Sequence, residues 1–388
     1  MSASASPGDG MTARGHSRQP GEGPIDAGRS TSAAQKAAAI DAAQEHPPTW
    51  KIVVKRALPV AVAGAAIYLV LPALIKVLGE WPRLSTLNPI WFTVALVAEI
   101  VAFTCNFALQ RLALRTRGWF AVVTAGLAGN AVTNSLPGGD AAGAAVQFSM
   151  LTTAGFDTDT AVGGLTAFSL LEVGGLLALP IFALPAILAG VPVSRGLVHT
   201  ALLGIAAFVL YAVFGVIVLR TDWPLATLGR VAQSLWNRIT RGHRQPVTGL
   251  DQRLLAERDT IRAVLGKDWR QAAVLTAGRL GFDYGCLLAA LRATGASPQP
   301  SLVLLAYAAA GIIALFPVTP GGLGIVEASL SGLLILAGVR AGYAVLATLA
   351  YRIASYWLPL LAGPPAYLLF RRRYGRPVPR RAAPSATS

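Results

Sequence analysis

The chain has 388 residues, of which 54% are hydrophobic and only 13% are charged, and its formal net charge is +15. Soluble domains carry about 25% charged residues, whereas the apolar residues here come in blocks of about 20, enough to cross a hydrocarbon core of about 30 Å. The composition therefore argues against a string of soluble domains. The absence of the alternating barrel pattern leaves an all-α polytopic membrane protein.

The two ends of the chain differ from the part between them. Residues 1–50 are rich in Ala, Gly, Ser, Pro and Thr and contain no apolar run, so we predict a disordered cytoplasmic tail. Residues 51–372 contain all the apolar blocks and are predicted to form one transmembrane domain. Residues 373–388 are predicted to form a second disordered tail, which is basic.

Six apolar blocks are long enough for full spans, and two further apolar stretches are broken by turn residues. The full spans are predicted at 57–78, 89–109, 160–188, 196–219, 269–291 and 343–370. The first broken stretch covers 119–136 and 141–155, and the second covers 301–317 and 325–337.

A Pro-Gly-Gly sequence interrupts each broken stretch. Proline removes a backbone donor and blocks the preceding helical turn, and glycine allows the chain to reverse. Bare backbone at membrane depth is tolerated only where protein buries it or water reaches it. Each broken stretch is therefore predicted to be a pair of half-helices, either re-entrant or broken, around a cavity. The helix-break residues are Pro137, Gly138, Gly139, Pro320, Gly321, Gly322 and Gly324.

A shift of 183 residues places one broken stretch over the other, with Pro-Gly-Gly on Pro-Gly-Gly and Gly155 on Gly338. The two halves of this repeat are about 88–189 and 269–372. Because the first span of one half runs outward and that of the other runs inward, the halves are predicted to be inverted. Inverted repeats with discontinuous helices are common in transporters, with the binding site near the midplane.

Lys and Arg cluster in four segments: the tail up to Arg56, the turn 111–117, the stretch 220–267 and the end from Arg371. This is the positive-inside pattern, which predicts a multi-pass protein of the plasma (inner) membrane with both termini in the cytoplasm. Without a recognition motif, the positive charge does not indicate a nucleic-acid partner.

The polar loop 220–268 separates the two halves on the cytoplasmic side. Residues 251–265 within it are predicted either as a helix lying on anionic lipid or as part of a solvated connector. The sequence leaves these two alternatives open.

Charged side chains inside the apolar blocks each cost roughly 2.5 to 3.5 kcal/mol and need a partner or a role. One interpretation is that they form structural pairs inside the bundle. The other is that a guanidinium meets an anionic lipid headgroup while the acids balance charge or relay protons. The substrate-cavity candidates are Arg279, Arg352, Glu172, Asp283, Glu99, Glu327, Asn134 and Asp140.

Local spacing adds three expectations. Arg279 and Asp283 are four residues apart on one helix and could pair there. Glu327 falls in the first turn of a half-helix, where a carboxylate caps the helix and gains from its dipole. Three amides are expected to hydrogen-bond between helices: Asn106, Asn130 and Asn134.

Residue types that carry catalysis or bind metals are few. Cys105 and Cys286 lie in apolar blocks, and four histidines are scattered without a ligand pattern. We therefore predict no metal, no cofactor and no enzymatic activity.

Two motifs resemble a known family. The run Phe316 to Ala328, FPVTPGGLGIVEA, and the run Tyr351 to Trp357, YRIASYW, are similar to motifs of the lysylphosphatidylglycerol synthase transmembrane region. The resemblance covers roughly residues 50–372. In the first half, where that family shows a Pro-Gly-Arg-like turn and then a glutamate, this chain has NSLPGGD, with Asp140 as the acid.

The resemblance implies a flippase-like protein that moves a phospholipid or polyprenyl-linked lipid between leaflets. The chain ends soon after the last span, so the family's soluble aminoacyl-transfer domain is not expected. Two other functions stay open: an integral-membrane enzyme that modifies lipid, and a non-transporting scaffold that binds a cell-envelope enzyme. Membrane lipids with an anionic headgroup are the expected partners, and the oligomeric state is not predicted.

Overall fold

The computed structural model describes residues 86–136, 138–188, 195–239, 250–315 and 319–375, and every regular element in these ranges is a helix. The predicted all-α fold is therefore confirmed. The predicted span 57–78, the N-terminal tail and most of the C-terminal tail lie outside the described residues, as does Pro137.

Five helices among the described residues are long and apolar enough to cross a membrane. They correspond to the predicted spans from the second to the sixth, so the chain is an integral membrane protein. The helices that carry these spans are α4 (Pro89–Ala113), α7 (Thr158–Leu188), α8 (Arg195–Arg220), α10 (Leu250–Ala293), and α13 (Ala341–Arg352) with α14 (Leu358–Tyr374).

The start of α4 shows how local sequence fixes these helices. Asn88 caps the helix, because its side-chain oxygen accepts the backbone N–H of Ile90 at 3.0 Å, and Pro89 at the first helical position needs no partner. The backbone N–H of Asn88 also donates to the carbonyl of Ala293 at 2.9 Å. The beginning of α4 is thereby joined to the end of α10.

Both broken stretches are pairs of short helices. The first pair is α5 (Phe120–Ser135) and α6 (Asp140–Thr153). The second is α11 (Pro300–Ala314) and α12 (Ile325–Leu336), separated by a 3₁₀ turn at Pro320–Gly322. The predicted interruption of the helix at each Pro-Gly-Gly is therefore present.

Glycines at the breaks adopt backbone angles that other residues avoid. Gly138 has φ 61° and Gly321 has φ 53°, and these two residues are 183 positions apart. Gly155 and Gly338, also 183 apart, have φ 98° and 90°. An L-residue with a side chain pays roughly 1 to 2 kcal/mol in this left-handed region. The two halves thus use left-handed glycines at matching positions.

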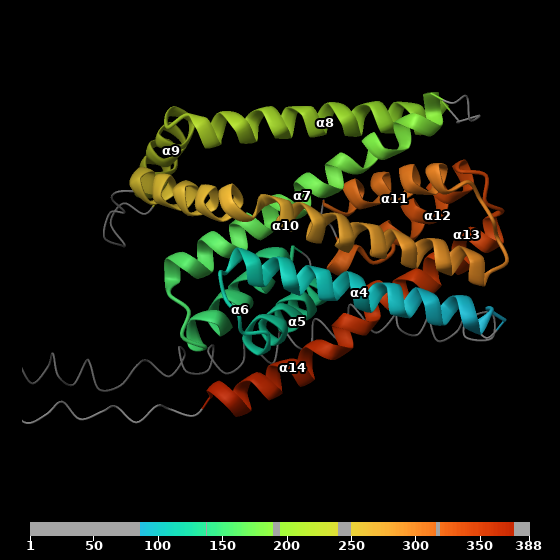
Figure 1. Cartoon of the computed structure of the whole chain (residues 1–388), viewed down its shortest axis with the longest axis horizontal. Coiled ribbons are helices and arrows are strands. Elements are labelled where there is room, and N and C mark those ends of the chain that lie inside the picture. Colours follow the sequence, from blue (N-terminus) through green and yellow to red (C-terminus); the bar gives the residue numbers. More distant parts are fainter. Residues whose placement is uncertain (1–85, 137, 189–194, 240–249, 316–318, 376–388) are drawn as a thin grey trace, which may run out of the picture. The chain divides into compact units, whose positions relative to one another are not determined.

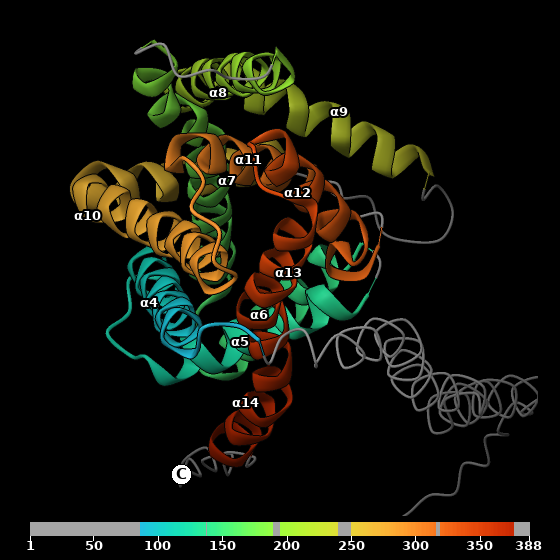
Figure 2. The ribbon, with the colours of Figure 1, turned by 90° about the vertical axis from the view of Figure 1, so that its right-hand side faces the viewer.

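Helices of each predicted half pack against helices of the other half. Helices α4 and α10, the predicted counterparts in the two halves, lie side by side (Figure 1). Helix α5 packs against α14 of the other half, and α11 packs against α7 of the first half (Figure 2). In each predicted half, the first short helix of the broken pair therefore packs on a long helix of the other half. A predicted inverted repeat would produce this arrangement. The repeat itself stays a prediction.

The polar loop between the halves contains more helix than the sequence indicated. Helix α9 (Trp223–Ile239) was not predicted, and α10 begins at Leu250, so residues 251–265 are helical. A kink at Asp268, with φ −111° and ψ 19°, separates this part from the apolar part of α10. Contact of the loop with lipid stays a prediction.

Two glycine substitutions should separate backbone strain from crowding. At Gly338 an added Cβ meets nothing within 4 Å, so Gly338→Ala should cost only the left-handed strain of about 1 kcal/mol. At Gly321 the Cβ would overlap the ring of Tyr356 and lie 3.1 Å from the carbonyl oxygen of Asn134. Gly321→Ala should therefore lower the thermal unfolding temperature of the purified protein further than Gly338→Ala does. Equal losses would contradict the packing of Tyr356 on this turn.

Candidate functional site

A cavity of about 670 Å³ lies among the helices of the two halves, and α4, α5, α6, α7, α10, α11, α12 and the last span all contribute to its lining. The structure brings the predicted residues to this one cavity, with the exception of Glu327. The predicted residues that line it are Glu99, Asn134, Asp140, Glu172, Arg279, Asp283 and Arg352. Their role towards a substrate stays a prediction.

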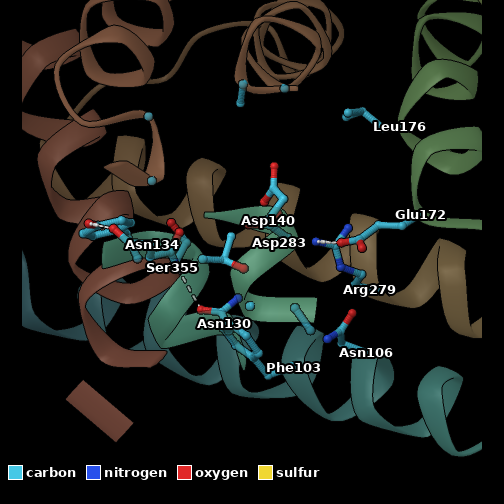
Figure 3. Close-up of a pocket in the computed structure, with 18 of the residues that line it drawn as sticks. Phe103, Asn106, Asn130, Asn134, Asp140, Glu172, Leu176, Arg279, Asp283 and Ser355 are labelled. Carbon is cyan, nitrogen blue, oxygen red and sulfur yellow. Dashed lines mark hydrogen bonds and ion pairs between the residues drawn. The ribbon is translucent and has the colours of Figure 1, made fainter. Parts of the chain in front are cut away.

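An ion pair joins α7 to α10 across the cavity. The guanidinium of Arg279 lies 2.5 Å from a carboxylate oxygen of Glu172, and Figure 3 shows the two side chains facing each other. About a quarter of the Arg279 side chain and a third of the Glu172 side chain stay exposed. The predicted pairing of Arg279 with Asp283 along one helix is wrong among the described residues, because Arg279 turns towards α7.

Arg352 is held more tightly, by three groups of the protein. It donates to Glu327 at 2.8 Å and to the carbonyl of Gly321 at 2.9 Å, and its guanidinium lies 4.3 Å from the centre of the Tyr356 ring. Glu327 also accepts the backbone N–H of Gly324 at 2.6 Å, which is the predicted cap of α12. Arg352 therefore fixes the second helix break to the last span.

The backbone next to Arg352 is also irregular. Residues Ile353–Trp357 form a π-helical turn between α13 and α14. Such turns widen a helix and frequently occur at functional sites. Tyr356 within the turn donates to the carbonyl of Asn134 at 2.9 Å, so the last span also reaches the first helix break.

Asp283 is bound by two phenols that the sequence analysis missed. Tyr307 on α11 donates to it at 2.7 Å, and Tyr351 on α13 donates at 2.8 Å. Both tyrosines are buried. The sequence could have indicated Tyr351, because it precedes Arg352 in the motif YRIASYW. Tyr307 lies in no motif, so no pattern in the sequence pointed to it.

The amides around the cavity pair differently from the prediction. Asn134 donates to Asn130 at 2.8 Å, but both belong to α5, so this bond does not join two helices. Gln147 on α6 donates to Gln110 on α4 at 2.8 Å, and this pair does bridge helices. Asn106 also lines the cavity, and its buried side-chain oxygen has no hydrogen-bond partner within the described residues.

The charges of the site do not balance. Carboxylates outnumber guanidiniums, and both guanidiniums already have a carboxylate partner. Glu99 and Asp283 line the cavity without an ion pair among the described residues. The cavity is therefore acidic in its formal charge.

A second cavity, of about 830 Å³, lies between α7, α8 and α10 and is lined almost wholly by apolar side chains. Glycine and alanine make much of its wall, at Gly174, Gly175, Ala277 and Gly281. Leu280 lines both cavities, next to Arg279 in the chain. The seam between α7 and α10 thus has the polar cavity on one side and this second cavity, called the apolar groove below, on the other.

Nothing among the described residues forms a metal centre, since no group of three or more His, Cys, Asp or Glu side chains lies together there. Cys105 and Cys286 are both free thiols.

Comparison with known proteins gives one family and one partial relative. The model of the family described as "Lysylphosphatidylglycerol synthase TM region" matches residues 57–363. A "UPF0104 membrane protein" of Methanothermobacter thermautotrophicus is 36% identical over 89 residues, which are 23% of this chain and 25% of the relative. The chain therefore aligns with only about a quarter of that relative's length. No solved structure matches the chain significantly.

Removing the guanidinium of Arg352 should lower the stability of the protein more than removing that of Arg279. Arg352→Gln leaves Glu327 without its cation and the Gly321 carbonyl without its side-chain donor, and should destabilise the protein by about 3 to 5 kcal/mol, the usual cost of breaking a buried pair. Arg279→Gln should cost clearly less, because water reaches both members of its pair. Thermal unfolding in detergent measures both, with Arg292→Gln at the exposed end of α10 as the control. A larger loss for Arg279→Gln would contradict these roles.

Proposed function

This chain belongs to the lysylphosphatidylglycerol synthase transmembrane-region family, and on that premise we propose that it moves a phospholipid or polyprenyl-linked lipid between the leaflets of the plasma membrane. The observation that carries the proposal is the adjacency of the polar cavity and the apolar groove. A membrane lipid needs both environments at once, because its headgroup must stay solvated while its chains must stay in hydrocarbon.

The seam between α7 and α10 is where the two environments meet. Glu172 and Arg279 pair across this seam on the polar side, while Gly175 lines the groove and packs closely on Leu280. Without side chains on its glycines, α7 approaches α10 closely and leaves room for a lipid chain beside it. A lipid lying across the seam would place its headgroup in the cavity and its chains in the groove.

Arg279 is the cation best placed to meet a phosphate. A guanidinium binds phosphate through parallel N–H donors, and its present carboxylate partner, Glu172, is a third exposed and free to move aside. Arg352 supports this role less, because three protein groups hold its guanidinium and its side chain is only 11% exposed. The remaining acids suit the hydroxyl or ammonium donors that many headgroups carry next to their phosphate.

The helix breaks support a mechanism of alternating access. Unwound backbone at Gly138 and Gly321 lies between short helices that contact the long helix of the opposite half. Small rotations of the short helices against α7 and α14 would open the cavity to one leaflet and then to the other. This movement needs no covalent chemistry at the site.

The proposal is tested by reconstituting the full chain in liposomes that contain headgroup-labelled lipids. Transfer of label between leaflets should be faster than in empty vesicles, and Arg279→Gln should reduce the rate at least tenfold while the protein remains folded. Labelled phosphatidylglycerol and phosphatidylethanolamine are compared to define the headgroup. If no lipid class moves faster than in empty vesicles, the protein is not a lipid translocator.

The groove gives a second test, in which one helix supplies both the variant and its control. An added Cβ meets nothing within 4 Å at Gly281, which lines the groove, or at Gly285, which lines neither cavity. Gly281→Phe should fill the groove and slow the transfer of two-chain lipids, whereas Gly285→Phe should leave the rate near that of the wild type. Equal effects of the two variants would contradict a role of the groove.

A further inference from the structure

A carboxylate of α4 lies at the polar cavity in an unusual state. Glu99 is only 3% exposed, and one of its oxygens has no hydrogen-bond partner among the described residues. An ionised carboxylate buried in this way would lose its hydration without compensation, at a cost of several kcal/mol. A protonated carboxyl group avoids most of that cost.

The ionisable neighbours of Glu99 come from three helices. Helix α10 contributes Asp283, Cys286 and Arg279, while the phenols of Tyr307 and Tyr351 approach from α11 and α13. The only cation in this set, the guanidinium of Arg279, is engaged by Glu172 on α7. Glu99 therefore faces another acid and has no cationic partner of its own.

Asp283 differs from Glu99 in that both of its carboxylate oxygens accept a hydrogen bond. It accepts hydrogen bonds from Tyr307 at 2.7 Å and from Tyr351 at 2.8 Å, and donors of this kind stabilise a carboxylate. Glu99, in contrast, leaves one buried oxygen unpaired among the described residues. A proton on Glu99 removes the cost of burying that oxygen as part of a charged group.

We propose that Glu99 holds one exchangeable proton that couples lipid movement to the proton gradient across the membrane. This inference rests on the proposed lipid transfer and adds its energy source. The site suits a proton better than a metal cation, because no group of three metal-binding side chains forms among the described residues. Water in the cavity, which Glu99 and Asp283 both line, gives the proton a route in and out.

The coupling follows from the position of Arg279. It lies one helical turn before Asp283 on α10, so a lipid phosphate that binds Arg279 also adds negative charge near the acid pair. Negative charge favours the protonated state of a nearby acid, and by linkage the bound proton favours the lipid phosphate in return. Proton and lipid should therefore cross together.

The size of the pH difference sets the expected ratio of labelled lipid between the two leaflets. A difference of one pH unit is equivalent to a tenfold ratio of proton activity, so one proton per lipid can sustain a leaflet ratio of about tenfold. Without a gradient the labelled lipid should spread evenly over both leaflets. The response to pH is therefore separable from the movement of lipid itself.

The test uses the full chain in liposomes with labelled phosphatidylglycerol, at equal pH and with a difference of one unit. The wild type should equilibrate lipid at equal pH and shift the leaflet ratio towards about tenfold under the gradient. Glu99→Gln resembles the protonated acid in shape but has no exchangeable proton, so whatever its rate of transfer, its final leaflet ratio should stay near one under the gradient. Asp159→Asn, an exposed acid at the start of α7, is the control and should behave as the wild type.

The outcomes separate the two proposals. Wild-type transfer that ignores the pH difference, or responds to a sodium gradient in its place, overturns the proton site and leaves lipid movement standing. No transfer at equal pH overturns the proposed function itself. An independent readout needs no transport: the infrared band of a protonated carboxyl group should be present in the wild type and absent in Glu99→Gln. Persistence of that band in the variant overturns the assignment of the proton to Glu99.

Discussion

The cost of charge at membrane depth is the constraint on which the rest of this structure depends. Each guanidinium of the cavity is neutralised by an acid from another helix, Glu172 for Arg279 and Glu327 for Arg352. Since these partners come from different elements, every pair also fixes two segments to each other. The polar cavity is therefore a structural feature as well as a candidate binding site, and the Arg279–Glu172 pair is the more exposed of its two ion pairs.

The helix breaks obey the same constraint for backbone groups. A carbonyl released from a helix in the bilayer needs a donor, and the breaks receive theirs from the last span. Arg352 donates to the carbonyl of Gly321, and Tyr356 donates to that of Asn134. The last span thus reaches both breaks, through Arg352 at the end of α13 and through Tyr356 in the π-helical turn that follows it. A change in this part of the last span would alter contacts at both helix breaks.

The sequence predicted the helices well because their signals are local. Apolar length, Pro-Gly-Gly and the 183-residue spacing each depend on neighbouring residues or on a simple repeat. The partners of the charges could not be predicted in this way. Arg279 lies four residues from Asp283, yet it pairs with Glu172, and Asp283 binds Tyr351, 68 residues away in the chain. Such choices depend on how α7, α11 and α13 pack on α10, which no local pattern records.

The difference between Arg279 and Arg352 bears on how a lipid could be moved without being trapped. A site that bound the phosphate with both guanidiniums would hold it too firmly to release it, and it would leave Glu172 and Glu327 without cations. Arg352 avoids this by keeping three protein partners. Arg279 has one ion-pair partner among the described residues, and that carboxylate can return when the lipid leaves. In the proposed transport, competition between Glu172 and a phosphate for one guanidinium would give the reversible binding that transport requires and that tight binding would prevent.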